Sequence, residues 1–156
     1  MSVETVRNYL KQWNAQDRIM EFPVSSASVA EAALAIHCEE KEIAKTMSFK
    51  IEDRAILIVT AGDAKIDNAK YKAAYHKKAA MLKSDELERM TGHPAGGVCP
   101  FAVKAGVMVY LDKSLKRFAK VYPACGSTNS AIELSLEELE TYSGYQEWVD
   151  VCKVLI

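Results

Sequence analysis

The sequence predicts an α+β fold in which a curled, barrel-like, mixed and mostly antiparallel sheet is flanked by helices, as a single domain over residues 1–156. Two apolar, β-branched runs, residues 55–62 and 106–111, have the composition of strands buried on both faces. Residues 43–51 directly precede the first run and are expected to pair with it as a hairpin. Neither G-x-G-x-x-G nor G-x-x-x-x-G-K-S/T occurs, which favours α+β over a doubly wound nucleotide-binding fold.

The N-terminal elements follow from periodicity and capping signals. An apolar stripe at helical spacing predicts a first helix over residues 3–15, and its members are Val3, Val6, Leu10 and Trp13. Residues 18–23 are predicted as a short strand that ends at a proline. Residues 26–38 are predicted as a second helix, because Ser28 and Glu31 have the spacing of a capping box.

The remaining elements alternate between helices and short strands. Residues 67–83 and 84–90 are predicted as two helices that separate the two buried strands. Short strands are expected near residues 119–123 and 130–134. A last helix begins at residue 135, where the sequence SLEELE again fits a capping box. No repeat or linker appears, so no domain boundary is expected.

The composition excludes several classes of protein. Twenty basic and 21 acidic residues give a net charge of −1, which argues against binding to DNA or long RNA but allows a small, local RNA contact. No apolar run reaches the about 18 to 20 residues of a membrane span, so a cytoplasmic protein without a membrane partner is expected. The four cysteines lack Cys-x-x-Cys spacing and are predicted to be reduced thiols, with no metal or cofactor.

Lys45 is the first candidate for chemistry. In the predicted strand 43–51 it shares the parity of the apolar residues Ile43, Met47 and Phe49. An inward lysine is expensive to bury unless its site needs a positive charge. The alternative is a lysine at a strand end whose amine reaches water.

The segment HPAGGVCPFAV, residues 93–103, is the second candidate. Gly96 and Gly97 allow a ligand to approach the backbone, and Pro94 and Pro100 stiffen the ends of the loop. A rigid loop with free N–H groups is suited to hold a carbonyl, an ester or an oxyanion. The alternative is a tight connection between a helix and a strand.

Cys99 and His93 form the third candidate, a nucleophile with its base. This chemistry requires a thiolate and a close partner. The six-residue separation does not establish that closeness, and packing roles for both residues are the alternative. His37 and His76 fall in predicted helices and are expected to be surface or packing residues.

A second glycine loop and a basic stretch complete the candidates. The loop between residues 123 and 134 carries small polar side chains, which either cap turns or join Lys45 and the first loop around a small polar acyl group. Six lysines between residues 65 and 83 form either a solvated helix face or a contact for RNA phosphates.

Four segments in this order resemble the YbaK/prolyl-tRNA synthetase-associated domain family. They are AKTMSFK, ILIVTAGD, MLKSDELERMTGHPAGGVCPFAV and LDKSLKRFAKVYPACGSTNSAIEL. The resemblance covers nearly the whole chain from about residue 20, and its most specific parts are the Lys-Thr strand and the GGVCPF loop.

The resemblance implies a hydrolase, a deacylase that acts in trans on mischarged tRNA. Its substrate would be the ester of a small amino acid such as Cys, Ala or Ser on tRNA-Pro or a related tRNA. The partners implied are the 3′ end of that tRNA and, as a further candidate, an aminoacyl-tRNA synthetase. The rival from another class is a non-catalytic module that senses an aminoacyl-tRNA or an amino acid, and an inward lysine favours the enzyme because a sensor has less need of it.

The family's functional positions map onto this chain residue by residue. Its essential lysine corresponds to Lys45, followed by Thr46. Its two substrate loops correspond to His93, Gly96, Gly97, Val98, Cys99, Pro100 and Phe101, and to Gly126 and Ser127. Family members form no covalent acyl-enzyme, which argues against a nucleophilic cysteine.

Three positions depart from the family pattern. Ala102 stands where many relatives have another glycine, and Ala131 lacks the carboxylate of one branch. Phe22 stands where that branch can carry a tyrosine. These differences bear on which amino acid is accepted more than on the class of reaction.

Overall fold

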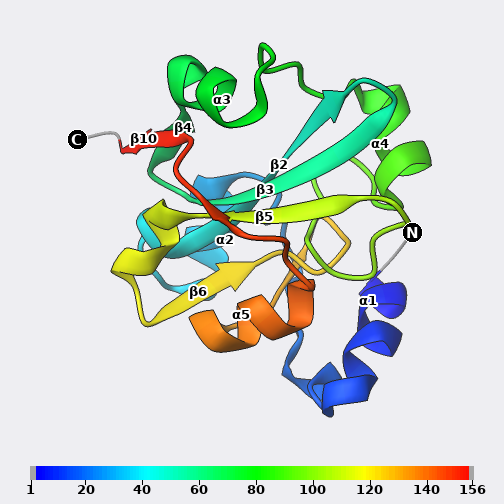
Figure 1. The fold of residues 1–156 in the computed structure, drawn as a ribbon. Coiled ribbons are helices and arrows are strands. Elements are labelled where there is room, and N and C mark those ends of the chain that lie inside the picture. The colour runs from blue at the N-terminus through cyan, green and yellow to red at the C-terminus, as the bar shows by residue number, and fades with distance from the viewer. Residues whose placement is uncertain (1–2, 155–156) are drawn as a thin grey trace.

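The structure, a computed structural model, describes residues 3–154 and is built around a six-stranded mixed sheet (Figure 1). The strand order is β8-β6-β2-β3-β5-β9. The bounds are β2 Ile43–Ile51, β3 Arg54–Ala61, β5 Met108–Asp112, β6 Lys120–Pro123, β8 Leu134–Ser135 and β9 Trp148–Val149. The predicted α+β class with a curled mixed sheet is confirmed.

The centre of the sheet is the predicted hairpin. Strands β2 and β3 pair antiparallel along their whole length, with Lys45 opposite Thr60. Seven of the eight β3 residues are buried, as expected for a continuous apolar run that is covered on both faces. Strand β5 adds parallel to β3, and β6 adds parallel to the first two residues of β2.

Two small sheets were not predicted in full. Strand β1, Met20–Glu21, pairs antiparallel with β7, Ser130–Ala131. Strand β4, Ala64–Ile66, pairs antiparallel with β10, Cys152–Val154. Elements of two or three residues carry too little periodicity to be recognised in a sequence, which explains why β4, β9 and β10 were missed and why the strand expected over 18–23 is shorter.

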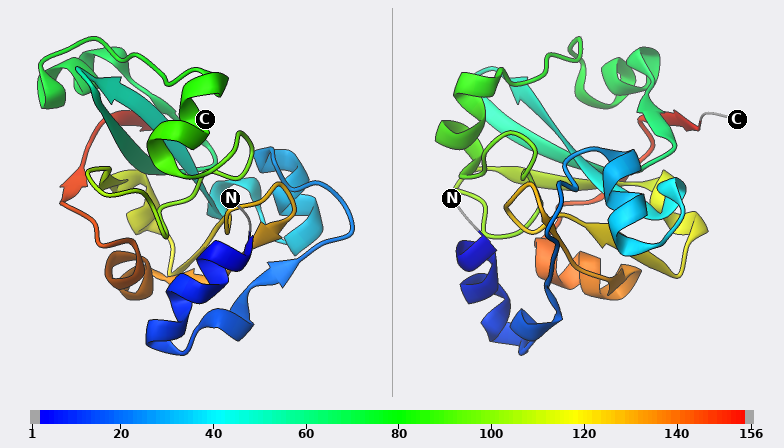
Figure 2. Two further views of the ribbon diagram at one scale, coloured as in Figure 1. Left: turned by 90° about the vertical axis from the view of Figure 1, so that its right-hand side faces the viewer. Right: turned by 180° about the vertical axis from the view of Figure 1, so that it is seen from behind.

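Five α-helices lie around the sheet in the described part of the chain. They are α1 Val3–Leu10, α2 Val29–Ile36, α3 Asn68–Tyr75, α4 Ser84–Thr91 and α5 Leu136–Ser143. Figure 1 shows α3 above the sheet and α5 below it, and the rear view in Figure 2 shows α2 in front of the sheet, beside the loop that follows β6. Ser28 and Ser135 form the predicted capping boxes of α2 and α5.

The helix predicted over 67–83 is wrong in its second half. Helix α3 ends at Tyr75, and His76 follows with a left-handed φ of +62°. The chain then runs extended along the edge of β2, where the Lys50 N–H donates to the Ala80 carbonyl at 2.8 Å and the Leu82 N–H to the Ser48 carbonyl at 3.2 Å. Strand β6 leaves this edge of β2 unpaired, and backbone pairing there outweighs the helix propensity of the segment.

The first helix is also shorter than predicted. Helix α1 ends at Leu10 and continues as a 3₁₀ turn, Lys11–Trp13, which stops at Asn14 with a φ of +57°. The apolar stripe is nevertheless buried or half-buried, so the predicted face is correct. No helix among residues 3–154 is long and apolar enough to cross a membrane.

Candidate functional site

A cavity of about 390 Å³ lies between α2, the first half of β2 and the two glycine loops. We call it the central pocket. The predicted residues that line it are Lys45, Thr46, Gly96 and Val98. Its volume is at the small end of the roughly 300–1,000 Å³ typical of ligand sites. The central pocket is where the segments identified from sequence converge.

Lys45 is half-buried on the wall of this pocket. Burial lowers the pKa of its amine below the ordinary value of 10.5, and the nearby Cys152 and Asp63 oppose this shift. Among residues 3–154, its amine forms no hydrogen bond or ion pair. A half-buried amine that makes no ion pair within the protein is suited to receive an anion from a ligand.

Thr46, the next residue, offers the pocket an unused hydroxyl. Its Oγ1 atom is buried and has no hydrogen-bond partner in the described part of the chain. Buried hydroxyls are normally paired, so this atom is available to an occupant of the central pocket. Lys45 and Thr46 have opposite parity along β2, and both nevertheless line the central pocket.

The first glycine loop begins with a tight turn. The Gly97 N–H donates to the Pro94 carbonyl at 3.0 Å, and Gly96 has a φ of +83° that favours glycine. Gly96 and Val98 line the central pocket, whereas Gly97 is buried behind it.

The two glycine loops pack directly against each other. A Cβ atom built on Gly97 would lie 2.9 Å from the backbone nitrogen of Ser127, and one built on Gly96 would lie 2.9 Å from Thr128 Cγ2. The sequence predicts glycines that admit a ligand to the backbone. At Gly97 the group that approaches is instead the backbone of the second loop, so this expectation is corrected.

The second loop is held by its own polar side chains. The Ser127 and Ser130 hydroxyl oxygens are 2.5 Å apart, and Ser127 Oγ also donates to Asn129 Oδ1 at 3.0 Å. Asn129 Nδ2 donates to the Phe22 carbonyl at 2.9 Å, which ties the loop to the segment before α2. Gly126 and Ser127 therefore shape the pocket from behind, and the turn-forming alternative describes most of this loop.

Cys99 and His93 do lie together, but not as a nucleophile and its base. Cys99 Sγ is 3.6 Å from His93 Nε2, and Nε2 in turn is 2.7 Å from the Phe101 carbonyl, to which it donates. Burial raises the pKa of the Cys99 thiol to about 12 and lowers the pKa of His93. Both residues are fully buried and neither lines the pocket, so they stay neutral and brace the loop.

Pro100 and Phe101 also belong to this buried layer. Phe101 is fully buried in the main hydrophobic core. Of the residues matched to the family, those that line the pocket come from β2 and from the turn at Gly96, and the others support that wall.

Sequence reasoning missed the opposite wall of the central pocket. It comes from the segment before α2 and from α2 itself, together with Tyr122 and Ala124. Ser28 lines the pocket and was identified only as a helix cap, which it also is, since its Oγ accepts from the Glu31 N–H at 3.1 Å. Small residues in a helix and a loop carry no signal of their own for a binding site.

The pocket has one charged side chain. Among the described lining residues only Lys45 is charged, and no group of three His, Cys, Asp or Glu side chains in residues 3–154 is arranged to hold a metal ion. Ala131, which stands at the position of a family carboxylate, is buried and lines the wall. The pocket can therefore bind a small anionic group, and the hydroxyl and backbone groups of its wall can make polar contacts with that group.

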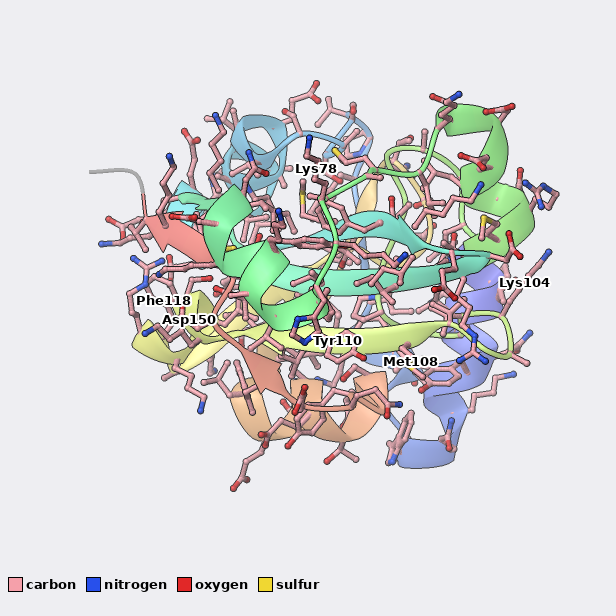
Figure 3. All side chains as sticks on the ribbon, turned by 45° about the horizontal axis from the view of Figure 1, so that its top comes forward. Lys78, Lys104, Met108, Tyr110, Phe118 and Asp150 are labelled. Carbon is pink, nitrogen blue, oxygen red and sulfur yellow. The ribbon has the colours of Figure 1, made fainter. Side chains whose placement is uncertain are left out.

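Two lysines of the basic stretch over residues 65–83 have carboxylate partners. Lys70 pairs with Asp150 at 3.1 Å and Lys77 with Glu52 at 3.6 Å. Figure 3 shows Lys78 on the extended segment that follows α3. A contact with RNA along this stretch stays a prediction.

Comparison with known proteins agrees with these features. A family model described as the aminoacyl-tRNA editing domain matches residues 24–142. The uncharacterised protein YwhH of Bacillus subtilis (strain 168) is 51% identical over 154 residues, which are 98% of each chain. A proline–tRNA ligase of Bacillus velezensis is 27% identical over 90 residues, 57% of this chain but only 16% of the ligase.

A solved structure extends the agreement to three dimensions. It is described as that of a candidate trans-editing enzyme for prolyl-tRNA synthetase, with a TM-score of 0.87 and 25% identity, over 97% of this chain and 96% of that one. The family model covers more than half of the chain, including both β2 and the two glycine loops. The chain therefore belongs to the aminoacyl-tRNA editing domain family.

Proposed function

We propose that this protein is a deacylase that acts in trans, hydrolysing the ester between a small amino acid and the 3′ end of a mischarged tRNA. The observation that carries the proposal is the unpaired, half-buried Lys45 on the wall of a small pocket that is otherwise uncharged. Membership of the editing family supports the class of reaction.

Lys45 is proposed to bind the RNA and not the amino acid. The α-amino group of an aminoacyl ester is itself basic, and a second cation beside it would be repelled. The phosphate of the terminal nucleotide is the anion that an amine at the pocket wall can bind. Lys45 thereby positions the ester over the pocket. Correct positioning of the reacting groups accounts for a large part of the reduction in the activation barrier.

The attacking group is proposed to be water held by the substrate itself. No carboxylate or imidazole lines the central pocket among residues 3–154, so no side chain there is an obvious general base. The terminal ribose has a free hydroxyl next to the ester, and this hydroxyl can orient a water molecule. Backbone N–H groups of the turn at Gly96 and Val98 are proposed to hold the developing oxyanion.

The size and polarity of the pocket are proposed to select the amino acid. Its inner wall carries several alanines, among them Ala44, Ala124 and Ala131, and one unpaired hydroxyl at Thr46. A small side chain such as that of Ala, Cys or Ser fits this wall, and a large side chain is excluded sterically, as in a second-sieve editing site.

The proposal is tested by measuring amino-acid release from alanyl-, cysteinyl- and seryl-tRNA, each on tRNA for proline. Release above the spontaneous rate from at least one of these substrates is expected, with phenylalanyl-tRNA uncleaved as the size control. Binding of these tRNAs without release would contradict the proposal and favour the non-catalytic sensor.

A further inference from the structure

A second cavity, of about 280 Å³, lies next to the central pocket. We call it the side pocket. It shares Lys45, Met47 and Met81 with the central pocket, so the two cavities adjoin across these residues. Its other walls come from β3, β4 and the start of α3, through Thr60, Lys65 and Asn68. Nothing in the proposed reaction uses this space.

Thr60 is the observation that points to a ligand in the side pocket. Its side chain is only 1% exposed, and its Oγ1 has no hydrogen-bond partner within the described residues. The residue interrupts the buried apolar run of β3, residues 55–61, where valine would fill the same space without the polar atom. An unpaired buried hydroxyl destabilises a fold, so its presence calls for a partner from outside the chain.

Asn68 offers a second polar group at the same cavity. It is the first residue of α3, but the cap of that helix is Asp67, whose Oδ1 accepts from the Ala69 N–H at 3.0 Å and the Lys70 N–H at 3.2 Å. The Asn68 amide is therefore not needed for capping, and it forms no hydrogen bond within residues 3–154. It lies exposed beside the side pocket.

The charges and the apolar walls define the chemistry of the occupant. Lys45 and Lys65 both line the pocket, and neither forms an ion pair in the described part of the chain. Phe49, Met47 and Met81 supply apolar surface, and Met81 is an exposed residue at the rim. A ligand with a flat apolar face, a polar edge and a nearby phosphate satisfies all three kinds of group.

We infer that the side pocket binds the base of the 3′-terminal adenosine of the tRNA. An asparagine amide can pair with the N6 and N7 atoms of adenine, and a threonine hydroxyl can bond a further edge atom. Lys45 then lies between the base and the aminoacyl ester, because it lines both cavities. The inference rests on the proposed function for the identity of the RNA, but it concerns a different cavity.

The test is an NMR titration of the full chain with AMP, the CCA trinucleotide and GMP. AMP and CCA are expected to shift the amide signals of residues 60, 65 and 68, and GMP to bind at least fivefold more weakly. Thr60→Val and Asn68→Ala are each expected to weaken AMP binding at least fivefold. Thr141→Val and Asn8→Ala, exposed matched controls on α5 and α1, leave it unchanged.

Thr60→Val carries a second readout that separates a binding role from a structural one. Because it removes an unpaired buried hydroxyl and keeps the shape, it is expected to raise the melting temperature while it weakens AMP binding. Weaker binding together with a lower melting temperature would mean that the hydroxyl supports the fold, and this would overturn the inference.

The failure of this inference is distinguishable from failure of the proposed function. Deacylation that proceeds with an unchanged KM in Asn68→Ala and Thr60→Val would overturn the assignment of the side pocket to the adenine base. It would leave the proposed deacylase function supported. AMP binding at residues 60 and 68 without any deacylation would overturn the deacylase and support the nucleotide site. Equal affinities for AMP and GMP would overturn the assignment to adenine.

Discussion

The Cα of Gly97 faces the backbone of Gly126 so closely that a Cβ atom on Gly97 would lie 2.9 Å from the Gly126 carbonyl carbon. This contact joins two loops that are about 30 residues apart in the chain and fixes the wall of the central pocket. The neighbours at Gly97 are backbone atoms, which cannot rotate away as a side chain can. The geometry of the pocket therefore depends on the absence of one methyl group.

Gly97→Ala is expected to push the two loops apart and to lower both stability and deacylation. Overpacking of this kind typically costs about 1–3 kcal/mol, and deacylation falls further because the Gly96 turn moves with its neighbour. The free energy of unfolding and the rate of amino-acid release measure the two effects. Gly106→Ala is the control, because a Cβ atom on Gly106 would have no neighbour within 4 Å. Gly106 has a φ of +90°, so this substitution lowers stability through backbone strain and leaves the pocket unchanged. Wild-type activity in Gly97→Ala would show that the contact is not needed.

Ala102→Gly is expected to stabilise the protein. Ala102 has a φ of +53°, in the left-handed region that favours glycine, at the position where many relatives are expected to carry one. Relief of this strain is worth about 1 kcal/mol, partly offset by the greater freedom of glycine in the unfolded chain. Urea unfolding measures the change, and a loss of stability would contradict the assignment of strain.

As pH rises, substrate binding is expected to weaken at a lower pH than it would if Lys45 had the pKa of an ordinary lysine. Burial lowers the pKa of Lys45, so its amine loses the proton, and the charge that binds phosphate, at a lower pH than 10.5. The fold itself responds in the opposite direction, because the folded state releases this proton before the unfolded state and gains stability as pH rises between the two pKa values. Titrations of the CCA trinucleotide between pH 7 and pH 11 measure the effect.

Lys45→Arg supplies the control for this pH dependence. A guanidinium keeps its charge throughout that pH interval, so the alkaline weakening should disappear even if overall affinity changes. A profile with the same alkaline limb in both proteins would assign the titration to another group.

Cys99→Ala is expected to keep deacylation and to lose some stability. Its thiol is fully buried, stays protonated because burial raises its pKa to about 12, and contacts His93 behind the pocket wall. Removal of one buried sulfur atom leaves a small cavity that costs about 1 kcal/mol. Amino-acid release and thermal unfolding measure the two effects, and loss of activity in a folded variant would restore the cysteine as a candidate nucleophile.

The sequence predicts the central hairpin and Lys45 because both depend on local patterns. A continuous β-branched run indicates the buried strand β3, and the parity of Lys45 relative to Met47 and Phe49 places all three along the side pocket. The end of α3 at Tyr75 could not be predicted, because the segment after it leaves the helix to cover the edge of β2. That competition is tertiary and leaves no local signal.

The prediction that a group closely approaches the backbone at the adjacent glycines is correct, but the prediction that this group is a ligand is wrong at Gly97. Two adjacent glycines do indicate a close approach to the backbone, but the sequence cannot say what approaches, and at Gly97 it is the second loop. Likewise, the wall formed by Ser28 and its neighbours was missed, because a cap residue that also lines a pocket looks like any other cap. Distant segments that share one cavity require the fold.

The most direct test of this account compares amino-acid release from mischarged tRNA for proline by the wild type, Lys45→Ala and Lys11→Ala. Lys11 is an exposed lysine on the turn after α1 and serves as the matched control. We expect at least a hundredfold loss in kcat/KM for Lys45→Ala, with an unchanged fold by circular dichroism, and wild-type rates for Lys11→Ala. Cleavage by Lys45→Ala at the wild-type rate would contradict this expectation.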